Sequence, residues 1–196
     1  MNWHSRKITL SFFIILSLGF LALFVIDKAV ESRLNNLPII SNVSNFELTN
    51  FDNQKFTNDQ LVGKLSLISF IFTNCEDACP IMSNHFSILQ KRFYDSNSIQ
   101  FISITVDPSV DSKDILKDYS KNYSIKDNWF FLTGDLQAII SLAEDGLFVS
   151  AALLPTGHST RFILVDQNAN IRRYYEGTDE SSIFEIQNDI LTLLDT

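Results

Sequence analysis

Two apolar runs on either side of an amphipathic segment constrain the fold of this chain most strongly. Residues 65–72 are mostly apolar without strict alternation, the pattern of a strand covered on both faces, and residues 99–106 have the same character. Between them, Met82, Phe86 and Leu89 recur at helical spacing and predict a helix with one face toward the core. Strand, helix and strand within about 40 residues form a βαβ unit, so we expect two parallel strands joined by a right-handed crossover.

The rest of the chain predicts a single α/β domain built around this unit. With 196 residues and 45% hydrophobic content, the sequence is long enough for one well-buried core. On a helix near residues 112–123, Ile115, Tyr119 and Tyr123 recur every four residues and are expected to face inward, with Asp111 or Ser112 as the N-cap. The other expected elements are hairpins at 46–57 and 160–175, a strand at 129–132, a helix at 136–143 and a last helix opened by a capping box at 182–185.

Residues 8–26 form a run of 19 residues without a charge. As a helix, this run would span roughly 29 Å, which is about the thickness of a bilayer core. It is longer than the apolar region of about 7–15 residues in a cleaved signal peptide, and no small-residue cleavage pattern follows it. A signal anchor is therefore favoured, with a cleaved signal peptide and a buried core helix as the alternatives.

The charges around this run predict its orientation. Arg6 and Lys7 precede it, whereas the charges just after it cancel, so the positive-inside rule leaves residues 1–7 in the cytoplasm. So short a tail leaves no room for an Arg-rich transit peptide, which favours a bacterial inner membrane with a periplasmic domain over the intermembrane-space side of a mitochondrial inner membrane. The expected organisation is a cytoplasmic tail at 1–7, a transmembrane anchor at 8–26, a tether at 27–44 and the folded domain at 45–196.

The net charge argues against one class of partner. It is −8, and the Lys and Arg residues are scattered along the chain rather than clustered. A nucleic-acid partner requires a basic stripe that neutralises phosphates, so we expect none.

Cys75 and Cys79, the two cysteines of the chain, lie where the run at 65–72 gives way to the predicted helix. Reactive groups in open α/β sheets gather beyond the carboxyl ends of strands, and a helix N-terminus favours the thiolate form of a cysteine. Glu76 and Asp77 disfavour a second negative charge, so the local field suits a bound cation. The two sulfurs are compatible with a small disulfide, with thiol–disulfide exchange or with a soft metal ion such as Cu(I), and the residues leave these alternatives open.

Three histidines are available as further ligands. His4 lies on the cytoplasmic side of the predicted anchor, and His85 lies on the apolar stripe of the helix, rotated by about 240° from Cys79. His158 lies in a loop that leads into a predicted strand, where functional side chains concentrate, although its own surroundings describe an ordinary exposed loop histidine. Met82 is a conceivable soft ligand, but its place in the apolar stripe favours core packing.

Four ordered motifs resemble those of the Sco/SenC family, copper-binding assembly factors of cytochrome c oxidase. They are Phe72-Thr73-Asn74-Cys75-x-x-x-Cys79-Pro80, Val106-Asp107-Pro108-x-x-Asp111, Asn128-Trp129-x-Phe131-Leu132-Thr133-Gly134, and His158-Ser159-Thr160 before the strand. The resemblance runs from about Phe46 to the C-terminus. It implies an α/β, thioredoxin-like fold, in which a central mixed sheet is flanked by helices and preceded by the N-terminal transmembrane helix.

The resemblance also implies a function. Cys75 and Cys79 match the copper-binding cysteines of the family, and His158 matches its third copper ligand. It implies a membrane-anchored copper chaperone that binds Cu(I) or Cu(II) and helps to assemble the dinuclear copper A site of cytochrome c oxidase subunit II. An upstream copper donor or thiol reductant is a further expected partner. The alternative is a thiol–disulfide oxidoreductase that keeps the cysteines of that subunit reduced; copper delivery needs no turnover chemistry, and we favour it over an enzymatic role.

Glu76 departs from the pattern of the family. The first cysteine of the motif is usually followed by Pro, and Glu76 stands there in this chain. This difference changes the stiffness and the charge of the loop, so the resemblance does not fix metal affinity or redox potential, whereas the ligand set is unchanged.

Overall fold

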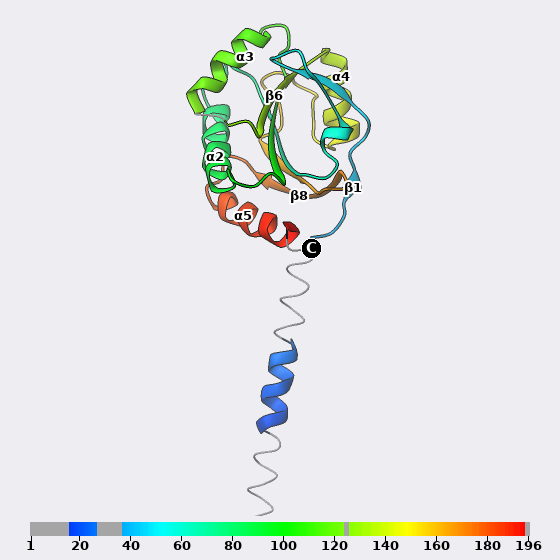
Figure 1. Ribbon diagram of the computed structural model, residues 1–196, viewed down its shortest axis with the longest axis vertical. Coiled ribbons are helices and arrows are strands. Elements are labelled where there is room, and N and C mark those ends of the chain that lie inside the picture. Colours follow the sequence, from blue (N-terminus) through cyan, green and yellow to red (C-terminus); the bar gives the residue numbers. More distant parts are fainter. Residues whose placement is uncertain (1–15, 27–36, 124–125, 195–196) are drawn as a thin grey trace, which may run out of the picture. The chain divides into compact units, whose positions relative to one another are not determined.

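The computed structural model describes residues 16–26, 37–123 and 126–194, which belong to two compact units divided after Leu37 (Figure 1). In the N-terminal unit, residues 16–26 are helical and their large apolar side chains are exposed. The predicted anchor begins at residue 8, so its first part, like the predicted cytoplasmic tail at 1–7, lies outside the described residues. Across the described ranges, no helix is both long enough and apolar enough to span a bilayer.

The folded unit begins earlier than the sequence predicts. Residues 27–36 of the predicted tether lie outside the described residues. Ser41 and Asn42, however, form an edge strand, β1, and the neighbouring Val43 is buried. The expectation that the tether reaches residue 44 is therefore wrong for this stretch. Backbone pairing holds Ser41 and Asn42 in the sheet, although two polar residues give no strand pattern of their own.

The domain is organised around one mixed sheet of eight strands (Figure 1). Its strands, in spatial order, are β1 (Ser41–Asn42), β8 (Asn170–Glu176), β7 (Arg161–Val165), β4 (Leu65–Ile71), β5 (Ile99–Thr105), β6 (Trp129–Thr133), β2 (Glu47–Asn50) and β3 (Lys55–Thr57). β4, β5 and β6 pair in parallel, whereas the other neighbouring pairs are antiparallel. The predicted βαβ unit, both predicted hairpins and the mixed sheet are thus confirmed.

Helices cover both faces of this sheet, with α2 and α4 on opposite sides of it in Figure 1. The α-helices of the domain are α2 (Ala78–Arg92), α3 (Lys113–Ser120), α4 (Leu136–Ser141) and α5 (Ser181–Leu194). The 3₁₀ helices η1 (Asn58–Gln60) and η2 (Lys121–Tyr123) and the π-helix η3 (Leu142–Gly146) are shorter. α2 joins the parallel strands β4 and β5, as the sequence predicts for a crossover helix.

Strand alternation divides the core into an aromatic and an aliphatic part. Phe86 of α2 packs against the rings of Phe101, Trp129 and Phe162, with ring centroids 4.7–5.6 Å apart. Ile102, the neighbour of Phe101 on β5, points to the other face because successive strand residues alternate, and it joins a mainly aliphatic cluster that includes Ile139 of α4. The aromatic part holds α2, and with it the cysteine-bearing turn, firmly on the sheet.

Two helix predictions need correction. On α3, Ser112 is the N-cap, since its hydroxyl accepts the Ile115 N–H at 3.3 Å, but Ile115 is 40% exposed and Leu116 is the fully buried residue. Tyr119 and Tyr123 do face inward, against the rings of Phe131 and Trp129, so the predicted stripe is wrong at Ile115 and correct at the two tyrosines. α5 begins at Ser181, whose N–H is accepted by the Asp179 carboxylate at 2.9 Å, so the predicted capping box opened by Ser182 does not form.

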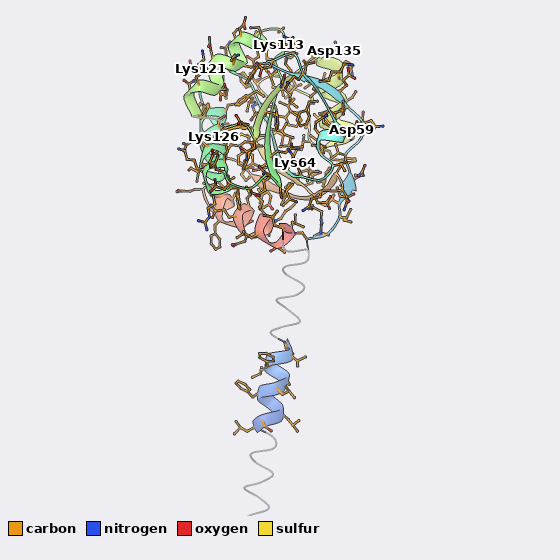
Figure 2. The ribbon with its side chains drawn as sticks, in the orientation of Figure 1. Asp59, Lys64, Lys113, Lys121, Lys126 and Asp135 are labelled. Carbon is orange, nitrogen blue, oxygen red and sulfur yellow. The ribbon has the colours of Figure 1, made fainter. Side chains whose placement is uncertain are left out.

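The charged side chains labelled in Figure 2 lie around the outside of the domain. Lys64 precedes β4, Lys113 opens α3, Lys121 follows that helix and Lys126 precedes β6. Surface charges placed in this way contribute little to stability, because water screens them. The stability of the fold rests on the two parts of its core.

Candidate metal site

The connection between β4 and α2, residues 72–77, carries the first of the two cysteines. Cys75 is half-exposed, and its backbone N–H donates to the Phe72 carbonyl at 3.2 Å. Cys79 follows in the first turn of α2 and is fully buried. Both are free thiols, so one site holds two sulfurs that differ in their access to solvent.

His158 reaches the same site from the other side of β4. It lies just before β7, and because β7 runs antiparallel beside β4, the start of β7 lies at the carboxyl end of β4. The His158 Nε2 atom lies 3.4 Å from the Cys79 sulfur. One ligand atom from each of Cys75, Cys79 and His158 lies within 4.8 Å of the other two. The structure therefore brings together the three residues that match the copper ligands of the family.

The hydrogen bonds of His158 fix its tautomer. Its Nδ1 atom lies 3.0 Å from the Ser159 carbonyl, which can only accept, so Nδ1 carries the proton and donates it. Nε2 then presents its lone pair to Cys79. The ring of Phe72 meets the imidazole edge-on, with centroids 5.4 Å apart, and restricts its rotation. The imidazole is thus held in the orientation that a metal ligand requires.

Burial controls the protonation of the two inner groups. It raises the pKa of Cys79 to about 12, and the nearby Cys75 and the negative charge of Asp111 add to this effect. Burial lowers the pKa of His158, although its bond to Ser159 acts in the opposite direction. Near neutral pH the metal-free site therefore holds a Cys79 thiol that donates to a neutral His158.

Cys75 differs from its partner. Partial burial would raise its pKa, but backbone N–H groups of Cys79, Asp77 and Ala78 at the start of α2 outweigh burial, and the pKa lies below that of an ordinary thiol. The Cys79 N–H contacts this sulfur at 3.4 Å. Cys75 is therefore the more nucleophilic thiol and the first to become a ligand.

The donor set fits a soft ion with few ligands. Metal–sulfur and metal–nitrogen bonds of about 2.0–2.3 Å in a three-coordinate arrangement place the ligand atoms about 3.5–4.0 Å apart. The separation of 3.4 Å between Cys79 and His158, and the limit of 4.8 Å for all three atoms, are within small side-chain movements of that geometry. Two thiolates with one imidazole suit copper, whereas structural zinc takes four ligands and this group supplies three.

An open cleft of about 410 Å³ leads to the site. Cys75, Glu76, Asp77, Thr156 and His158 are among the residues that line it, whereas Cys79 lies behind them. A ligand or a partner therefore approaches Cys75 and His158 first, past two carboxylates that attract cations.

Asp111 is the residue near the site whose place the sequence did not predict. It was a candidate N-cap, but Ser112 has that role, and the Asp111 carboxylate is buried with 1% exposed. It accepts the backbone N–H and the hydroxyl of Thr73, two residues before Cys75, and the hydroxyl of Thr105. Its position in a motif after β5 was the only signal in the sequence.

The other candidate ligands lie elsewhere. His85 is buried on α2, and its Nδ1 atom lies 2.8 Å from the Gly177 carbonyl. Met82 is fully buried in the core, as its place in the apolar stripe predicts. Asp107, which belongs to one of the family motifs and is not a candidate ligand, lies in the turn after β5, where its carbonyl accepts the N–H groups of Val110 and Asp111.

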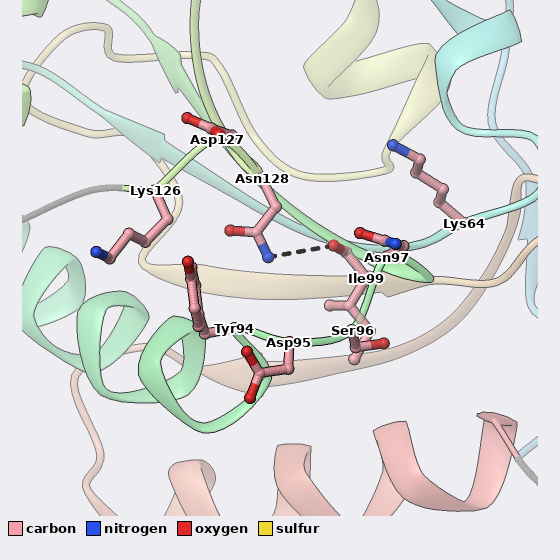
Figure 3. A pocket seen from close by; sticks show the side chains of 9 residues that line it. All are labelled: Lys64, Tyr94, Asp95, Ser96, Asn97, Ile99, Lys126, Asp127 and Asn128. Carbon is pink, nitrogen blue, oxygen red and sulfur yellow. Dashed lines mark hydrogen bonds between the residues drawn. The ribbon is translucent and has the colours of Figure 1, made fainter.

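A larger cleft of about 590 Å³ lies at the opposite end of the parallel strands (Figure 3). Lys64, Asp95 and Lys126 are among its lining residues, and Asn128 donates to the Ile99 carbonyl at its floor at 3.3 Å. Charges of both signs lie around it, and the cluster of cysteines and histidine does not reach it. Donor chemistry, rather than size, therefore selects the smaller cleft at the cysteines as the candidate site.

Comparisons with known proteins agree with the motifs. The SCO1/SenC family model matches residues 40–195. The SCO1 protein homolog of Bacillus subtilis (strain 168) is 33% identical over 160 residues, which cover 78% of this chain and 83% of that protein.

Two solved structures are similar to the folded domain. BsSco, described as a member of the Sco family of cytochrome c oxidase assembly proteins with a disulfide switch, has a TM-score of 0.71 and 32% identity, over 80% of this chain and 95% of that one. Copper-bound ScoI of Bradyrhizobium japonicum has a TM-score of 0.63 and 25% identity, over 75% of this chain and 98% of that one.

Proposed function

This chain belongs to the SCO1/SenC family, and we propose from that membership and from the cluster of Cys75, Cys79 and His158 that it is a copper chaperone for the assembly of cytochrome c oxidase. The observation that carries the proposal is the convergence of two sulfurs and one imidazole nitrogen, whose ligand atoms lie within 4.8 Å of one another. A soft donor set of this kind is suited to copper.

Cys75, Cys79 and His158 have different roles in binding the copper cargo. Cys75 has the lower pKa and the better access, so it captures the ion first. Cys79 must lose its proton to bind, and His158 adds the third bond through Nε2. Two thiolates suffice for Cu(I), and the imidazole adds a ligand that Cu(II) favours more strongly. Because Cys75 and His158 line the open cleft, an acceptor can replace these ligands one at a time.

The partner follows from the family. BsSco is described as an oxidase assembly protein, and we propose that this chain delivers copper to the copper A site of subunit II. An upstream copper donor, or a reductant that reopens a Cys75–Cys79 disulfide, completes the cycle, since only reduced sulfurs bind the ion.

The proposed setting is a bacterial inner membrane. The uncharged run at 8–26 would serve as a single-pass anchor, and Arg6 and Lys7 would keep the tail in the cytoplasm. The domain would then face the periplasm, where free thiols tend to be oxidised and a reductant is needed.

The pair of unequal thiols also supports a second candidate, thiol–disulfide exchange. The Cys75 thiolate would attack a disulfide of the target protein and release one target thiolate. Cys79 would then lose its proton and attack the Cys75 sulfur, closing the Cys75–Cys79 disulfide and releasing the second target thiolate. The burial and high pKa of Cys79 make this second step slow, so we place exchange second to copper delivery.

A copper titration distinguishes the two candidates. The full chain, purified in detergent and reduced without oxygen, is titrated with Cu(I) and Cu(II) as wild type, His158→Ala and Cys75→Ser/Cys79→Ser. His85→Gln, a buried histidine outside the cluster, is the matched control. We expect a stoichiometric complex with a sulfur-to-Cu(II) charge-transfer band in the wild type and the control.

His158→Ala should lose that band and keep Cu(I), and the double serine variant should bind neither ion. A protein that binds no copper, yet reduces disulfides at a rate unchanged by His158→Ala, would contradict the chaperone and support exchange.

A further inference from the structure

The carboxylate of Asp111 lies between the carboxyl ends of two parallel strands. β4 and β5 end in register at Ile71 and Thr105, and Asp111 follows β5 after a short turn. The Asp111 carboxylate accepts the Thr105 hydroxyl at 2.5 Å, the Thr73 hydroxyl at 2.5 Å and the Thr73 N–H at 3.2–3.3 Å. One buried side chain thus joins the end of β5 to the cysteine-bearing connection.

These bonds fix the position of Cys75 relative to the end of β5. Thr73 is two residues from Cys75, and the intervening turn is closed by the bond from the Cys75 N–H to the Phe72 carbonyl. Phe72 is itself held against His158. If Asp111 were removed, Thr73 would lose the acceptor for its N–H and for its hydroxyl, and the turn would lose its attachment to β5. A part-buried N–H or hydroxyl without an acceptor is unfavourable, so the turn would rearrange until water could accept these hydrogen bonds.

The charge of Asp111 acts on the same site. Its three donors are neutral groups, and no ion pair within the described part of the chain involves its carboxylate. A negative charge that is buried and not neutralised acts over a longer range than one in water, because the surroundings screen it less. The Asp111 carboxylate is hydrogen-bonded to Thr73, two residues before Cys75, which places its charge beside the cysteine-bearing turn. This charge adds to the burial that raises the pKa of Cys79.

We propose, on the basis of the copper function proposed above, that Asp111 is a positioning residue for the Cys75 turn and that its charge biases the bound ion toward Cu(II) over Cu(I). With the same three ligands, Cu(II) has one more positive charge than Cu(I), so a nearby fixed anion stabilises it more. Two unit charges about 12 Å apart at an effective dielectric constant of about 20 change an equilibrium constant by about tenfold. A tenfold change is about 59 mV for a one-electron couple.

Asp111→Asn separates charge from position. The amide has nearly the same shape and keeps an oxygen for the Thr73 N–H, but it has no charge. Asp118→Asn is the matched control, because it removes an exposed carboxylate from the same part of the chain. In the full-length protein loaded with copper, we expect the midpoint potential of the Cu(II)/Cu(I) couple to rise by about 59 mV in Asp111→Asn and to stay unchanged in Asp118→Asn.

The positioning role is measured without copper. Amide hydrogen exchange of residues 73–75 should be at least about tenfold faster in Asp111→Ala than in wild type, with Asp111→Asn between them. Thr73→Val keeps the carboxylate and loses one of its donors; it should also speed exchange, and it replaces Asp111→Ala if that variant does not fold.

Each half of the proposal has its own refutation. An unchanged or lower potential in Asp111→Asn would overturn the charge effect, and wild-type exchange rates in Asp111→Ala or Thr73→Val would overturn the positioning role. If the wild type binds no copper, the proposed function fails, and the charge effect fails with it. The exchange data still decide the positioning role.

Discussion

The two cysteines should react with an alkylating reagent at very different rates, in an order that the structure predicts. The experiment exposes the reduced, metal-free protein to a brief pulse of iodoacetamide at several pH values. At pH 7, a thiol with a pKa of about 12 is ionised in roughly one molecule in 100,000. Cys75, with a pKa below the ordinary value of 9.0, is ionised in more than roughly one molecule in 100.

At pH 7, the ionised fraction of Cys75 is thus at least about 1,000 times that of Cys79. The higher intrinsic nucleophilicity of the Cys79 thiolate reduces this advantage. A thiolate of higher pKa is intrinsically more reactive, and a Brønsted coefficient of about 0.4–0.5 makes the Cys79 thiolate roughly 16- to 32-fold more reactive over a difference of about three pKa units. We therefore expect Cys75 to react at least about 30-fold faster than Cys79 at pH 7. The full burial of Cys79 increases the difference further, because the reagent must reach the sulfur.

The assay is mass spectrometry of peptides that separate the two cysteines after each pulse. The rate for Cys75 should rise with pH around a midpoint below that of the same protein unfolded in guanidinium, because its folded pKa is the lower one. In the unfolded control, both cysteines should react at similar rates. Alkylation of Cys79 as fast as that of Cys75 in the folded protein would refute the assignment of the outer, nucleophilic thiol and the inner, protonated one.

Two further predictions concern the supports of the site. Phe86→Ala removes the ring that packs on three aromatic side chains beneath α2, so we expect the free energy of unfolding, measured in urea, to fall by about 3–5 kcal/mol; a loss below about 1 kcal/mol would show that this core does not hold the helix. Gly157→Ala would place a Cβ atom 2.4 Å from the Leu153 Cβ and 2.9 Å from the Leu153 carbonyl oxygen, so the backbone must shift and move His158. We expect the Cu(II) charge-transfer band to weaken as in His158→Ala, and to persist in Gly134→Ala, where the added atom meets the flexible end of a leucine side chain; a wild-type band in Gly157→Ala would contradict this role.

Local sequence patterns predicted the frame of the domain well. Residues 65–72 and 99–106 are apolar because both faces of a central parallel strand are covered, and β4 and β5 lie there, in parallel. The stripe of Met82, Phe86 and Leu89 identified the inner face of α2, and all three residues are buried. These signals are strong because the faces that an element buries determine which of its own residues are apolar.

Patterns failed where neighbours in space, rather than in sequence, decided the outcome. Ser41 and Asn42 join the sheet only because β8 offers an edge to pair with. On α3, the packing of one short helix, and not its own spacing, selects Leu116 over Ile115 for the core.

The sequence by itself determined that two cysteines follow a central strand at the start of a helix, since strand, turn and helix are all local. Its motifs also indicated the family, which the family model confirms. Tertiary structure decided the rest of the site. His158 lies 79 positions from Cys79 and meets it only because β7 runs antiparallel beside β4. Asp111 reaches Thr73, in the turn that carries Cys75, only because β4 and β5 end in register. The different pKa values of the two thiols have two causes: backbone N–H groups at the start of α2, a local feature, lower the pKa of Cys75, whereas burial, which only the tertiary structure decides, raises that of Cys79.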